Sequence, residues 1–154
     1  MSQVLSEQAL LAFARLLKVH ASLTRELNAE LVNEHGLTIN DYEVLLRLSR
    51  AEGNRMRRVD LAEQVLLTAS GITRLLDGLE QCGYVERAAC ASDRRVTYAV
   101  LTDAGRAKLD EAAVTHLAGI QQRFGERLDE EEIDRLAELL ARLPGANGDT
   151  DCSP

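Results

Sequence analysis

The chain of 154 residues is 45% apolar and 28% charged, so it can bury a core, and wholesale disorder is excluded. With no tryptophan, two phenylalanines and three tyrosines, that core is expected to be aliphatic. No apolar run is long enough to cross a membrane, and the first residues do not resemble a signal peptide, so we expect a cytoplasmic protein without a membrane partner. Three cysteines without paired or metal-type spacing predict no disulfide framework, no metal site and no cofactor.

The charges are unevenly distributed along the chain. The net charge is −7, but residues 47–108 hold 11 Lys and Arg against 8 Asp and Glu, whereas the remainder holds 7 against 17. Attraction to phosphate depends on local patches more than on net charge. The basic centre is therefore compatible with a nucleic-acid partner, although charge alone does not distinguish such a surface from a solvated face.

The first third of the chain predicts two helices. Leucines recur at three- and four-residue steps over residues 5–35, and no glycine or proline interrupts them until Gly36. A second helix, ending near Arg50, is predicted to begin with Thr38 as its N-cap and Asp41 in a capping-box position. A loop over residues 52–54 follows.

The centre of the chain predicts a helix pair and a β-hairpin. A short helix over residues 59–65 and a tight turn lead to Thr68, which is predicted to cap a helix over residues 69–82. Strands over residues 84–87 and 96–101 then flank a polar tip that contains Arg94 and Arg95. This order predicts a mainly α chain with a winged helix-turn-helix and a small β-hairpin wing.

The last third predicts two helices with long apolar stripes. The first is capped by Thr102, the second opens with acidic residues near 129–132, and Pro144 and Gly145 end it. Together with residues 1–35, residues 103–144 are expected to form a helical dimerisation region, because a small winged domain over residues 36–102 cannot cover their leucines. The polar tail over residues 145–154 is predicted to be disordered.

The predicted helix pair and wing carry residue types that read DNA. A helix fits the major groove, where Ser70, Thr73 and Arg74 could bond base edges. An arginine at a hairpin tip can enter the minor groove, and Asp93 could orient Arg95 there through a charge-assisted hydrogen bond. The candidate DNA-binding residues are Arg57, Arg58, Thr68, Ser70, Thr73, Arg74, Asp93, Arg94 and Arg95.

Several of these segments resemble one protein family. Residues 60–80 are similar to the helix-turn-helix of the MarR family, the multiple-antibiotic-resistance regulators, and residues 83–87 resemble the start of its wing. Asp93 and Arg95 match its Asp-x-Arg wing motif, and residues 101–105 resemble its passage from strand to helix. The resemblance implies a homodimeric transcription factor, usually a repressor, that binds a pseudo-palindromic operator in double-stranded DNA and is often released by a small effector.

The resemblance also implies an effector pocket between the dimerisation helices and the winged domain. Polar groups on apolar faces make His20, Tyr42 and His116 its candidates, for an aromatic or lipophilic effector, although buried histidines and tyrosines more often serve only packing. No residue identifies the effector.

Two alternatives stay open, and neither is an enzyme. One is a winged helix that binds proteins and not DNA. The other is a thiol-redox-responsive regulator acting through Cys90, whose neighbouring arginines would lower the pKa of its thiol. An enzyme is not indicated, because no Ser-His-Asp pattern, glycine-rich phosphate loop or carboxylate pair can be argued from the sequence.

Overall fold

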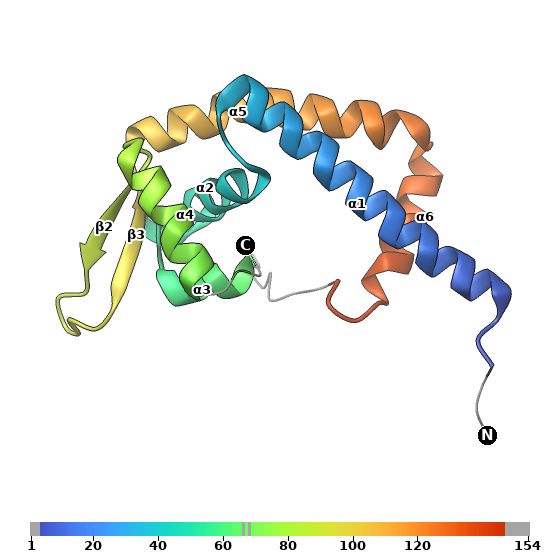
Figure 1. Cartoon of the computed structure of the whole chain (residues 1–154), viewed down its shortest axis with the longest axis horizontal. Coiled ribbons are helices and arrows are strands. Elements are labelled where there is room, and N and C mark those ends of the chain that lie inside the picture. Colours follow the sequence, from blue (N-terminus) through green and yellow to red (C-terminus); the bar gives the residue numbers. More distant parts are fainter. Residues whose placement is uncertain (1–3, 66, 68, 147–154) are drawn as a thin grey trace.

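The computed structural model describes residues 4–65, 67 and 69–146 as a mainly α-helical chain with one small sheet. Figure 1 shows α5 running along the top of an arch, with the sheet and α2–α4 beneath one end and α6 at the other. The elements are α1 (Glu7–His35), α2 (Ile39–Arg50), η1 (Glu52–Asn54), β1 (Arg55–Arg57), α3 (Arg58–Gln64), α4 (Ala69–Gln81), β2 (Val85–Ala89), β3 (Thr97–Leu101), α5 (Asp103–Arg123), η2 (Gly125–Arg127) and α6 (Glu130–Ala141).

Local capping chemistry sets the ends of the first two helices. Gly36 ends α1 in the left-handed conformation, with a φ of 68°, as its position after the last leucine predicted. The predicted capping box of α2 is confirmed: the Asp41 amide donates to Thr38 Oγ1 at 3.1 Å, and the Thr38 amide donates to Asp41 Oδ2 at 2.8 Å. The predicted N-cap of α4, Thr68, lies outside the described residues, as do residues 147–154 of the polar tail that was predicted over residues 145–154.

The sheet has three antiparallel strands in the order β1–β3–β2. The predicted hairpin is confirmed, with Val85 opposite Leu101 in its register. The sequence did not predict β1, where Met56 lies opposite Ala99. Its three residues carry one inward methionine between two exposed arginines, a pattern too short to give a strand signal.

The core is aliphatic, as the composition predicted, and lies where α2, α3, α4, β3 and α5 meet. Leu45, Leu48 and Leu61 have no exposed surface. The predicted apolar stripe of α4 is buried at Ile72, Leu76 and Leu79, so the opposite face of this helix lies at the surface.

The helices at the two ends of the chain leave much apolar surface exposed. Arg123 near the end of α5 joins α1 by ion pairs to Glu26, at 2.8 Å, and Glu30, at 2.7 Å. Beyond these contacts Leu10 and Phe13 of α1 are exposed, and α6 has no buried residue. Within the described residues no helix is both long and apolar enough to pass through a membrane.

Gly105 allows α5 to leave the sheet. A Cβ at this position would overlap the carbonyl oxygen of Tyr84, which also accepts a hydrogen bond from the Thr102 amide at 3.1 Å.

We expect Gly105→Ala to lower the free energy of unfolding by about 1–3 kcal/mol, because the backbone must move. Gly78→Ala in α4 is the matched control: its Cβ meets open space, so stability should rise by about 0.5–1 kcal/mol. Urea denaturation measures both, and equal effects would contradict the prediction.

Candidate nucleic-acid interface

The surface face of α4 holds three of the candidate DNA-binding residues. Ser70, Thr73 and Arg74 are exposed, opposite the buried stripe, in the half of the helix nearest its first residue. Arg58, at the first position of α3, donates a hydrogen bond from Nη2 to Thr73 Oγ1 at 2.8 Å. This contact joins the two helices at the surface. Thr68 lies outside the described residues, so the structure does not bear on its predicted role.

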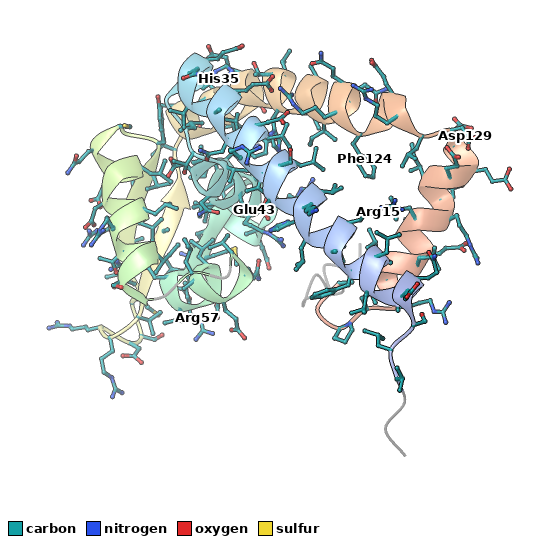
Figure 2. The ribbon with its side chains drawn as sticks, turned by 45° about the vertical axis from the view of Figure 1, so that its right-hand side comes forward. Arg15, His35, Glu43, Arg57, Phe124 and Asp129 are labelled. Carbon is teal, nitrogen blue, oxygen red and sulfur yellow. The ribbon has the colours of Figure 1, made fainter. Side chains whose placement is uncertain are left out.

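The arginine that precedes α3 is held by an ion pair. Arg57 donates from Nε and Nη2 to the two carboxylate oxygens of Asp60, at 2.8 and 3.0 Å. This hydrogen bond raises the pKa of Arg57 above its usual value. Figure 2 shows Arg57 at the same end of the molecule as the tip of the hairpin between β2 and β3.

The wing tip is ordered by Asp93. Its Oδ1 accepts a hydrogen bond from the Arg95 amide at 3.0 Å and lies 3.4 Å from Arg95 Nε. The side chain of Arg95 is nevertheless 92% exposed, and Arg94 is exposed as well. Asp93 therefore fixes the backbone of the turn, whereas the Arg95 guanidinium extends into solvent.

A cleft between the helix pair and the wing collects part of the candidate set. Its volume is about 450 Å³, and its basic lining comes from α3, the residue before it, and the wing. Arg74 and Arg94 are not part of this lining, so the candidates divide between the cleft and the surfaces beside it. The residues that line it are Arg57, Arg58, Val59, Ala62, Ile72, Thr73, Arg95, Val96 and Thr97.

Two further arginines take positions that sequence reasoning missed. Arg55 of β1 stacks over the ring of Tyr98, with its Cζ 4.8 Å from the ring centroid. Arg87 of β2 pairs with Asp77 and with Glu80 of α4, the latter at 2.7 Å. The only sequence signal for the ion pairs of Arg87 was the three-residue spacing of Asp77 and Glu80, followed by an arginine in the next predicted strand.

The three effector candidates are not brought together. The rings of Tyr42 and His116 are in contact, with centroids 4.5 Å apart and planes tilted by 51°, and burial raises the pKa of Tyr42 and lowers that of His116. His116 Nδ1 is buried without a hydrogen-bond partner. His20 is exposed on α1, eleven residues before the buried Leu31 and thus about 16 Å away along the helix axis. The structure therefore separates His20 from the Tyr42–His116 pair.

Cys90 lies in the wing, as predicted, but its thiol is influenced by other groups than expected. Its Sγ lies 3.2 Å from Ser92 Oγ, and this hydrogen bond, followed by those from the backbone of Ser92 and Asp93, lowers the pKa of the thiol. The expectation that neighbouring arginines lower this pKa was wrong. Among the described residues, no group of three or more histidine, cysteine and acidic side chains could hold a metal ion.

Comparison with known proteins gives consistent matches. A model of the MarR family matches residues 35–96. The HTH-type transcriptional regulator MhqR of Bacillus subtilis is 30% identical over 139 residues, covering 90% of this chain and 93% of MhqR. AbsC, a MarR family transcriptional regulator from Streptomyces coelicolor, superposes with a TM-score of 0.82 at 34% identity, over 90% of this chain and 93% of AbsC. Sco3205, another from that organism, solved in complex with DNA, gives 0.85 at 27% identity, over 92% and 88% of the two chains.

A helix pair followed by a sheet with an arginine-bearing hairpin defines a winged helix-turn-helix protein. The chain belongs to the MarR family of transcriptional regulators, which confirms the resemblance first noted in residues 60–105. This family consists of regulators and not of enzymes.

The pKa of His116 predicts how stability depends on pH. Since burial lowers this pKa in the folded chain, the unfolded chain takes up the proton first as the pH falls through about 6.5. Stability should therefore decrease between pH 7.5 and 5.5, and His116→Gln should reduce that decrease. Urea midpoints at the two pH values, at one protein concentration, measure the effect. His20→Gln, on the exposed surface of α1, should retain the wild-type decrease, and an undiminished decrease in His116→Gln would contradict the prediction.

Proposed function

We propose that the protein is a sequence-specific DNA-binding transcriptional regulator that acts as a repressor on a pseudo-palindromic operator. The observation that carries this proposal is the basic cleft, in which Arg57, Arg58 and Arg95 meet Thr73 beside the exposed face of α4. Arginines bind phosphates and guanine edges, and hydroxyl groups bond either bases or phosphates. The similarity to a MarR family regulator solved with DNA supports the same assignment.

Each candidate has a proposed role that follows from its position. Ser70, Thr73 and Arg74 would face base edges in the major groove, and Arg95 would enter the minor groove. Asp93 would hold the wing tip in shape for Arg95. The remaining basic and hydroxyl candidates, Arg57, Arg58, Thr68 and Arg94, would contact phosphates.

We propose that the functional unit is a homodimer. Phe13 is 59% exposed in α1, and Leu10, Leu139 and Leu143 are also exposed, so the terminal helices present large apolar side chains that need a cover. A second copy, related by a two-fold axis, would supply that cover and present two α4 helices to two half-sites. Residues 1–35 and 103–144 would then form the dimerisation region, and residues 36–102 the DNA-binding domain.

A small aromatic or lipophilic effector is a further part of the proposal. The tilted, contacting rings of Tyr42 and His116 lie at the junction of α2 and α5, and the unpartnered His116 Nδ1 offers a polar anchor beside them. A ligand with an aromatic ring and one hydrogen-bonding group would suit such a place. His20 would take part only if a second subunit approached it, because it is exposed in the isolated chain.

A winged helix that binds only proteins is the competing function. Such a protein would have no use for an exposed Arg95 beside Arg57 and Arg58 in one cleft. Measuring the binding of any duplex over a series of salt concentrations separates the two, since phosphate contacts make affinity fall steeply with salt. Redox control through Cys90 would appear in the same assay as a loss of affinity after mild oxidation.

The first test of DNA binding is selection of a preferred duplex from a random pool by the wild-type protein. Arg95→Ala should then weaken binding to that duplex by about 1–3 kcal/mol, while its stability stays within about 0.5 kcal/mol. Arg74→Ala should relax the preference at one base pair in each half-site. If Arg74 contacts only phosphate, affinity should instead fall evenly over all sequences, with a smaller salt slope.

Arg135→Ala provides the matched control for both substitutions, since this exposed arginine lies on α6, away from the cleft. It should leave affinity and preference unchanged. Unchanged affinity of Arg95→Ala for the selected duplex would contradict the assigned role of the wing.

The dimer makes a separate prediction. Wild-type protein should sediment as a dimer at micromolar concentration, and the double variant Leu10→Lys/Phe13→Lys as a monomer, because it places two charges in the proposed interface. Its affinity for the selected duplex should fall towards that for unrelated DNA. Val59→Lys, at an exposed position on α3, is the control and should remain dimeric. A wild-type monomer would overturn both the dimer and the two-half-site operator.

A further inference from the structure

Arg87 joins the wing to the second half of α4. It projects from β2 and makes ion pairs with both Asp77 and Glu80, which stand three residues apart on the helix. The hydrogen bond to Glu80 is the main cause of the raised pKa of Arg87. We call Arg87, Asp77 and Glu80 together the Arg87 clamp.

The clamp contributes little to the free energy of unfolding. Its three side chains are between 39% and 51% exposed, and ion pairs at such positions contribute only about 0–1 kcal/mol. The strand is already attached to the core through Val85, which is buried in the same apolar cluster as Leu79 of α4. Apolar packing of Ile72, Leu76 and Leu79 determines which face of α4 is buried, and the two ion pairs add a directional link between this helix and the strand at the surface.

The clamp acts on the same rigid helix as the proposed base-reading residues. Arg74 lies three residues before Asp77, so a rotation of α4 that moves Asp77 moves Arg74 by a similar amount. A bidentate contact between a guanidinium and a base edge tolerates errors of only about 0.5 Å and 10–20°. Two ion pairs from one fixed strand would limit this rotation.

We propose that Arg87 is a positioning residue for operator recognition, which orients α4 relative to the wing through Asp77 and Glu80 without touching DNA. This inference rests on the proposed function. Two other roles would explain the position of this charge, between two acids of α4, less well. A phosphate contact is disfavoured because the two acids outweigh the single positive charge of Arg87. A purely electrostatic role, in which Arg87 only masks two acids from DNA, makes a different prediction.

Arg87→Met in the full chain tests the proposal, because methionine keeps the apolar stem and removes the guanidinium. Affinity for the duplex selected by wild-type protein should fall on the order of tenfold, a coupling of about 1.4 kcal/mol. Affinity for a scrambled duplex and the slope of affinity against salt should not change, since no phosphate contact is lost. A salt slope reduced by about one would show a phosphate contact and overturn the proposal, as would an unchanged affinity for the selected duplex.

The triple variant Arg87→Met/Asp77→Asn/Glu80→Gln separates positioning from electrostatic masking. It lacks the clamp but carries no unmasked acids, so a positioning role predicts that it binds the selected duplex as weakly as Arg87→Met. Recovery of wild-type affinity would assign the loss to repulsion between the acids and DNA, and would overturn the proposal. Arg135→Met on α6 controls for the loss of an exposed arginine.

A measurement without DNA tests the Arg87 clamp separately from the proposed function of DNA binding. Amide hydrogen exchange in α4 should be faster in Arg87→Met than in wild-type protein, because the helix is held less firmly. If wild-type protein selects no duplex, the proposed function fails, and faster exchange then identifies a clamp that serves another surface of α4. Unchanged exchange together with normal duplex selection would overturn the clamp alone.

Discussion

Burial of one face of α4 is the constraint on which the rest of the interface depends. Ile72, Leu76 and Leu79 sit in the same apolar cluster as Leu61 of α3 and Val85 of β2, so helix pair and sheet share one core. Because a helix has a fixed period, burying these three side chains also determines that Thr73 and Arg74 lie at the surface. The polar chemistry of the interface is thus a consequence of aliphatic packing on its far side.

The sequence predicted the parts of this fold whose signals are local. The capping box at Thr38 and the glycine at position 36 follow from residues within one turn, and the hairpin follows from alternating residues around a polar tip. Strand β1 was not predicted, because its pairing with β3 joins residues more than forty positions apart. A strand of three residues is also too short to show a period in its sequence. Its two arginines indicated only charge, although Arg55 is held by the ring of Tyr98.

The distinction between local signals and long-range contacts also applies to the candidate site. The outward phase of Ser70 and Arg74 could be predicted from helical period, and the turn at Asp93 and Arg95 from a short motif. The hydrogen bond from Arg58 to Thr73 and the ion pairs of Arg87 connect different elements, so no local pattern contains them. His20 shows the opposite error: it shares a helix face with Leu27 and Leu31, but it lies before them in a part of α1 that extends beyond the core, where it is exposed.

The continuity of α5 has a mechanical consequence. Its first turn is held against Tyr84 at Gly105, and its last turn is tied to α1 by Arg123, so one uninterrupted rod joins the sheet to the terminal helices (Figure 1). Its 21 residues span about 31 Å. A tilt of about 5° at either end therefore displaces the other by about 3 Å, which is close to the length of one hydrogen bond. A small tilt of the terminal helices would thus displace the wing directly, because α5 moves as one rigid lever. No relay of side-chain rearrangements is needed.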